Sequence, residues 1–149
     1  MGGIGEEGGR GRARDDPVCL FFFLVEKKLN MNVDDQPLEV CSKQPSTGWD
    51  RSGYCKYKEN DGGRHIVCAT MTDDFLNYTK TQSNDLTTSS GNFPGLKSGD
   101  NWCICAGRYT EAAMNDHAPL INRKATNKIA LQWPAVEKAL ILHQQQIQK

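Results

Sequence analysis

Residues 93–109, FPGLKSGDNWCICAGRY, combine two turn signals with the strongest strand pattern in the chain. Proline fixes φ and glycine permits φ > 0, so Pro94-Gly95 and Ser98-Gly99-Asp100 predict a tight reversal just before Trp102. From Trp102 to Tyr109 we expect a strand, because its side chains alternate in character.

This alternation divides the expected strand into two faces. One face carries Trp102, Ile104, Ala106 and Arg108, and the other carries Cys103, Cys105, Gly107 and Tyr109. The two thiols therefore point the same way. Burial of Trp102 and Ile104 would contribute about 3 to 6 kcal/mol, a large part of a small domain's stability. We predict that this is the central strand.

Composition indicates one globular domain without a polyanionic partner. The chain has 149 residues, 38% hydrophobic and 24% charged, and 18 basic residues balance 18 acidic ones. A net charge of zero gives no long-range attraction to nucleic acid, so we expect none as a partner. No run approaches the roughly 18 apolar residues of a membrane-spanning helix, so we expect no membrane partner either.

The longest apolar run, Val18 to Val25, does not have the flanks of a signal peptide. Asp15 and Asp16 precede it, and residues 26–28 (Glu-Lys-Lys) follow it. We therefore expect an intracellular location, cytoplasmic or organellar, with reduced cysteines. The glycine-rich residues 1–16 predict disorder. We divide the chain into a disordered or poorly ordered extension, 1–28, which is dispensable for folding, and one compact domain, 29–147.

The remaining periodicity predicts an α+β fold. We expect a short mixed or antiparallel sheet packed by two or three helices, with long irregular loops. The expected elements are strands at 29–33, 38–41 and 65–71, helices capped by Thr72 and Thr110, an extended segment at 120–124, and a last helix from Pro134.

Several separated motifs resemble domain-of-unknown-function family 2237. They are Pro37 to Ser42 (PLEVCS), Asp61 to Ala69 (DGGRHIVCA), Asn84-Asp85-Leu86 and residues 93–108, in order between about Asn32 and Leu142. The resemblance implies a compact α+β domain, found mainly in bacteria and some algae, with no established activity, cofactor or partner. Here Ser83 replaces a family glycine, and Tyr109 replaces a tryptophan.

The cysteines leave three alternatives open. Five lie within the expected domain: Cys41, Cys55, Cys68, Cys103 and Cys105. Structural zinc sites usually show two Cys-x2 to 4-Cys pairs, whereas the one close pair here is Cys103-Ile104-Cys105. Plain core packing is the favoured interpretation. Metal binding, with Cys41, Cys68, Cys103 and Cys105 as candidate ligands, and a reactive thiol are the others. We expect no metal and no cofactor.

The histidines do not identify a catalytic base from the sequence alone. His65 and Cys68 lie three residues apart, which places them on opposite faces of a strand and argues against a direct pair. The sequence does not determine whether His65, His117 or Arg108 reaches a cysteine. His143 lies on the apolar stripe of the last helix and is interpreted as a core or boundary residue.

A polar loop is the favoured site. Residues 81–92 exceed the usual connection length, and such loops are often functional. We expect Asp85 and the strand end at Asp100 to Trp102 to form the rim of a site. The candidate binding residues are Asn84, Asp85, Asp100, Trp102, Arg108 and Glu111; the alternative for them is turn and cap chemistry.

Two functional classes follow, and the sequence does not decide whether the protein is an enzyme. The favoured one is a small binding or assembly module that recognises an unknown small molecule or protein through the polar loop. The alternative is a thiol- or metal-dependent enzyme that uses Cys68, Cys103 or Cys105, with His65 as a further catalytic candidate.

Overall fold

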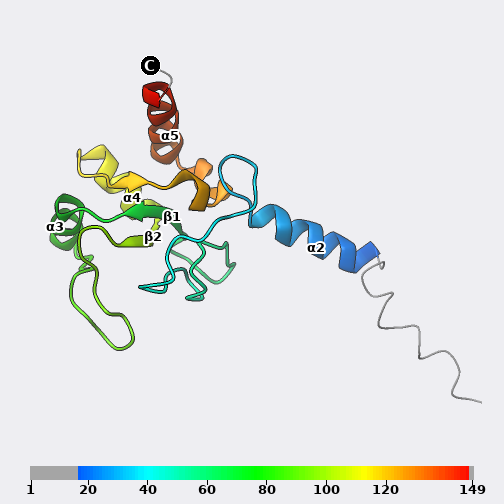
Figure 1. Ribbon diagram of the computed structural model, residues 1–149, viewed down its shortest axis with the longest axis horizontal. Coiled ribbons are helices and arrows are strands. Elements are labelled where there is room, and N and C mark those ends of the chain that lie inside the picture. The colour runs from blue at the N-terminus through cyan, green and yellow to red at the C-terminus, as the bar shows by residue number, and fades with distance from the viewer. Residues whose placement is uncertain (1–16, 148–149) are drawn as a thin grey trace, which may run out of the picture.

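A three-stranded antiparallel sheet lies at the centre of the domain (Figure 1). This computed structural model describes residues 17–147. The strands are β1 (His65–Thr70), β2 (Asn101–Cys105) and β3 (Leu120–Ile121), in the order β2-β1-β3. The predicted α+β class is confirmed. The prediction that the Trp102 strand is central is wrong, because β3 pairs with the far side of β1 and leaves β2 at an edge.

Within residues 17–147, four α-helices surround this sheet or extend from it. They are α2 (Pro17–Leu29), α3 (Asp73–Thr81), α4 (Ala106–Met114) and α5 (Pro134–Ile147), and two short 3-10 helices lie at Arg123–Ala125 and Lys128–Gln132. Where the sequence predicts an extension without fixed structure, α2 occupies its second half and projects away from the sheet (Figure 1). Residues 1–16 of that extension lie outside the described residues.

The strand β2 ends earlier than its sequence pattern predicts. It stops at Cys105, and α4 begins at Ala106, so the expected strand at 106–109 and the expected helix start at Thr110 are both wrong. The reason is that β1 begins at His65, opposite Cys105, and offers no partner for a longer β2. The Ala106 N–H instead donates to the Arg64 carbonyl (3.0 Å).

Two expected strands near the start of the domain do not form. In the first, Met31 and Asn32 make isolated bridges, with Pro37 and Asn127, rather than a ladder, and in the second, residues 38–41 form neither strand nor bridge. Buried Asn32 explains the loss of the first strand, because its Oδ1 accepts bonds from the N–H groups of Asp34 (2.9 Å) and Gln36 (3.0 Å). Such local bonds replace strand pairing. The expected extended segment at 120–124 shortens likewise to two-residue β3.

The interior consists of two separate clusters. The larger one contains alternate residues of the sheet, such as Val67, Ala69 and Ile104, packed against α3, α4 and α5. The smaller one consists of Ala125 and the side chains of four cysteines: Cys41, Cys55, Cys68 and Cys103. Because Cys68 and Cys103 alternate with Val67 and Ile104, the two clusters lie on opposite faces of the sheet.

The predicted N-cap of α3, Thr72, can be tested by mutation. Thr72 Oγ1 accepts a bond from the N–H of Phe75 (3.0 Å), whose side chain is fully buried. We expect Thr72→Ala to cost about 1 kcal/mol of unfolding free energy, measured by urea denaturation, because one helix N–H loses its acceptor. Thr72→Ser retains the acceptor and should be close to wild type; equal losses in both variants would contradict the cap.

Candidate functional site

A cavity of about 270 Å³ opens beside β2. Five parts of the chain line it, and they are far apart in sequence. Its lining consists of Trp49, Arg51, His65, Asn84, Asp85, Leu86, Phe93 and the β2 residues Trp102, Cys103, Ile104 and Cys105. The cavity thus collects aromatic rings, charged groups and a thiol at one end of the sheet.

The turn before Arg51 is fixed to the edge of β2. Buried Thr47 accepts a bond through its hydroxyl from the N–H of Cys103 (2.8 Å), which would otherwise be an unpaired edge donor. Gly48 has φ +94°, and a Cβ there would lie 2.3 Å from the Tyr54 carbonyl oxygen, so only glycine fits. The turn therefore holds Trp49 and Arg51 at the cavity.

Ring contacts order the cavity walls. Trp49 stacks on His65, with ring centroids 5.7 Å apart, and Phe93 meets Trp102 edge to face at 5.4 Å. The Arg51 guanidinium carbon lies over the Trp102 ring, 5.0 Å from its centroid. Flat apolar surfaces and one cation therefore face a shared space.

The polar loop forms the remaining wall, and Asp85 organises it. One Asp85 oxygen accepts bonds from the Thr87 N–H (2.9 Å) and hydroxyl (2.7 Å), and the other accepts from the Thr88 hydroxyl (2.7 Å). These bonds from Thr88 and Thr87 hold the pKa of Asp85 well below its usual range. The N–H of Leu96 closes the loop by donating to the Leu86 carbonyl (2.8 Å).

A buried carboxylate orients His65. Asp61 has no exposed surface, and its two oxygens lie 2.8 Å from the His65 backbone N–H and 2.7 Å from ring Nδ1. The ring also packs against Gly63, where a Cβ would lie 2.7 Å from ring Cε1. Because Asp61 engages Nδ1, the other ring nitrogen, Nε2, is the one left available for chemistry.

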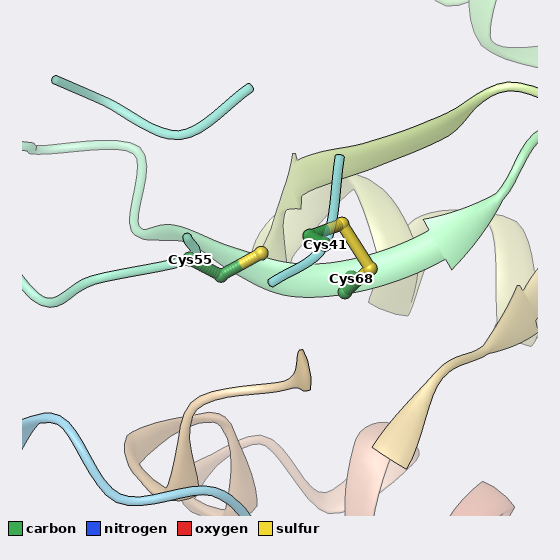
Figure 2. A group of neighbouring side chains, drawn as sticks. All are labelled: Cys41, Cys55 and Cys68. Atoms are coloured by element: carbon green, nitrogen blue, oxygen red, sulfur yellow. A yellow bond between two sulfur atoms is a disulfide. The ribbon is translucent and has the colours of Figure 1, made fainter. Parts of the chain in front are cut away.

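Four cysteines are joined in two disulfides, so the prediction that the cysteines are reduced is wrong. The pairs are Cys41–Cys68 and Cys55–Cys103. Since Cys68 and Cys103 are opposed on β1 and β2, the two bridges lie side by side, as Figure 2 shows for Cys41–Cys68 beside Cys55. The sulfurs of Cys41, Cys55 and Cys68 lie within 4.8 Å of one another.

This arrangement changes the interpretation of each cysteine candidate. A disulfide sulfur is neither a nucleophilic thiol nor a thiolate ligand, so Cys41, Cys68 and Cys103 do not offer those groups in this structure. Among the described residues, the free thiols are exposed Cys19 and half-buried Cys105. The Cys-Ile-Cys motif therefore contains one structural cysteine and one thiol that lines the cavity.

The other polar candidates lie in different local settings. Asp100 accepts a bond from the Lys97 N–H (2.9 Å) within the turn before β2. Arg108 donates to the Gln82 carbonyl (3.0 Å) and pairs with Glu111 at 3.3 Å. These three residues do not line the cavity, whereas Asn84, Asp85 and Trp102 do. His143, expected in the core or at its boundary, is exposed on α5.

Sequence reasoning missed Trp49, Arg51, Asp61 and Phe93. Asp61 and Phe93 lie within motifs that carry the family resemblance, namely Asp61 to Ala69 and residues 93–108. The glycine and proline residues of these motifs indicate turns, but they do not show which side chains face a cavity.

Comparison with known protein families finds a match over residues 31–142 of the chain. They match the family described as "Uncharacterized protein conserved in bacteria (DUF2237)". A comparison with curated proteins finds no match. Among the described residues, no helix is long and apolar enough to cross a membrane.

The disulfides predict a definite mass and stability. Each bridge removes two hydrogens, so the oxidised chain should weigh about 4 Da less than the reduced chain. We expect the paired change Cys55→Ser and Cys103→Ser to cost about 2–4 kcal/mol of unfolding free energy, whereas Cys19→Ser should be neutral. A full-mass chain under non-reducing conditions would show that the bridges are absent.

The pKa of Asp85 predicts how the loop responds to acid. Its native pKa lies below the usual 3.8, so the stabilisation from its ionised form is complete above the unfolded pKa. That stabilisation is lost as pH falls through the lowered native value. A carboxyl ¹³C titration should therefore place the Asp85 midpoint well below 3.8; a midpoint at or above 3.8 would mean that Thr87 and Thr88 do not hold the carboxylate.

Proposed function

Because the chain belongs to the DUF2237 family, whose description states no activity, we propose a function from the cavity itself: the protein is a small-molecule-binding module. Its ligand is a planar ring that carries a carboxylate. The observation that carries this proposal is the convergence of three aromatic rings and one guanidinium on a single cavity, with Trp49, Phe93, Trp102 and Arg51 in its lining.

The aromatic walls favour a flat ligand. Small-molecule sites are mostly apolar concave spaces of about 300–1,000 Å³, and this cavity of about 270 Å³ suits a ligand of one or two rings. The Trp49 ring is partly exposed, so it offers a flat surface on which a planar ring gains contact that a puckered ring does not. Ring shape is therefore the first determinant of affinity.

Arg51 favours a carboxylate on that ring. Nη1 of Arg51 donates one hydrogen bond to the Gly48 carbonyl oxygen (2.8 Å). A guanidinium has five N–H donors in total. The remaining donors suit paired recognition of a carboxylate. The loop residues Asn84 and Asp85 add an amide and an ionised carboxylate at the other wall, which suits a ligand with a hydrogen-bond donor there.

The proposal includes the location of the protein. We infer an intracellular protein and, of the cytoplasmic and organellar alternatives, favour an organelle with an oxidising interior. Two disulfides support this choice, because disulfides persist mainly in oxidising compartments.

Binding of benzoate tests the proposed function. Two of the three tryptophans line the cavity, so benzoate should change tryptophan fluorescence saturably, and cyclohexanecarboxylate, with equal charge and a puckered ring, should bind more weakly. We expect Arg51→Ala to weaken benzoate binding about tenfold or more, since a charged hydrogen bond contributes about 1.5–3 kcal/mol.

Lys138→Ala is the matched control for this experiment. Lys138 is an exposed cation on α5 that lines a different depression, so its loss should leave benzoate affinity unchanged. Equal effects of Arg51→Ala and Lys138→Ala, or equal affinity for the flat and puckered acids, would contradict the proposal.

A further inference from the structure

We propose that Cys105 is the nucleophile of a thiol-dependent acyl-transfer site within the cavity, with His65 as its base and Asp61 as the residue that positions His65. The substrate class is a small carboxylic ester or thioester. The inference rests on the proposed function in one respect, namely that the cavity admits a small ligand.

Sheet pairing brings the thiol and the imidazole together. Cys105, the last residue of β2, is the cross-strand partner of His65, the first residue of β1, and both line the cavity. Opposed residues of an antiparallel pair have Cβ atoms about 4.5–5.5 Å apart. The ladder is irregular between His65 and Val67, and bulges of this kind re-aim side chains near sites.

The Asp61–His65 pair provides an oriented base. The ring is held through Nδ1 by the fully buried carboxylate, and its face stacks on Trp49. These contacts leave Nε2 as the nitrogen able to accept a proton. Nucleophile, base and orienting carboxylate are the three parts by which activated nucleophiles are recognised on unrelated folds.

The reaction also needs hydrogen-bond donors for a developing oxyanion, and Cys105 lies beside such donors. Cys105 is the N-cap of α4, and its side chain accepts no capping bond. Its Sγ lies 3.7 Å from the position that a Cβ on Gly107 would occupy, above the first helical turn. The Ala106 N–H of that turn already donates to the Arg64 carbonyl. The next N–H groups, those of Gly107 and Arg108, have no acceptor within the helix, so they can donate to a substrate oxygen next to the thiol.

The reaction is redox-neutral and its atoms balance. As Cys105 Sγ attacks the acyl carbon, its proton moves to His65 Nε2, and a C–S bond forms. Collapse of the tetrahedral intermediate breaks the bond to the leaving alcohol or thiol, which takes that proton. Water then attacks the thioester and gives a proton to His65, which passes it to Cys105 Sγ as the C–S bond breaks, so that the carboxylic acid is released and the Cys105 thiol is restored.

Cys19 and His117 make internal controls within the same chain. Cys19 is the other free thiol, exposed on α2, and it does not line the cavity. His117 also pairs through Nδ1 with a carboxylate, that of Asp74 (2.9 Å), and also stacks on an aromatic ring, that of Tyr78. His117 therefore matches His65 in its contacts but does not line the cavity.

The test is acetylation by p-nitrophenyl acetate, followed by peptide mass spectrometry under non-reducing conditions. We expect Cys105 to be acetylated faster than Cys19, with release of p-nitrophenolate. His65→Gln should lower the ratio of the two rates about a hundredfold, the usual contribution of a general base, while His117→Gln leaves it unchanged. Melting temperatures confirm that each variant is folded.

Asp61→Asn tests the positioning role separately. We expect a lower ratio of the rates together with altered ¹⁵N shifts of the His65 ring, because the proton is no longer held on Nδ1. If Asp61→Asn does not fold, His65→Gln alone decides. Equal acetylation of Cys105 and Cys19, or equal effects of His65→Gln and His117→Gln, would overturn the inference.

Benzoate binding separates this inference from the proposed function. Fast, His65-dependent acetylation of Cys105 in a protein that does not bind benzoate would support the nucleophile and reject only the ring-carboxylate ligand. Benzoate binding with an unreactive Cys105 would reject the nucleophile and leave the binding module.

Discussion

The antiparallel pairing of β1 with β2 positions both the disulfides and the cavity lining. It sets Cys68 opposite Cys103 in the interior and His65 opposite Cys105 at the end of the ladder. The first pair places two disulfides beside each other, and the second places a histidine and a free cysteine at facing positions in the lining of one cavity. A register shift of one residue would move the disulfide cysteines and the His65–Cys105 pair to the opposite face of the sheet.

The disulfides hold the cavity walls in place, although Cys103 is the one disulfide cysteine in the cavity lining. Cys55–Cys103 and Cys41–Cys68 tie the irregular 41–55 segment to β2 and β1. A buried hydroxyl completes the attachment, because Thr47 accepts a bond from the Cys103 N–H. This segment contributes no strand to the sheet, yet it presents Trp49 and Arg51 at a fixed position, which preorganises the cavity.

The polar loop and the buried Asp61 show two uses of a carboxylate in one site. Asp85 is exposed and ionised, and it fixes the backbone of its own loop through Thr87 and Thr88. Asp61 is buried and fixes the ring of another residue, His65, four positions along the chain. Asp85 determines the shape of a wall, whereas Asp61 engages Nδ1 of His65 and leaves Nε2 as the other ring nitrogen.

Local pattern in the sequence was enough for the α+β class, the β1 strand, the Thr72 cap and the start of α5, because each depends on periodicity or on a capping residue within a few positions. The early end of β2, its edge position, both disulfides and the placement of His65 opposite Cys105 could be seen only in the folded chain. These features depend on which distant segments lie beside each other. Local pattern encodes neighbours along the chain, and only the folded sheet brings position 65 to position 105.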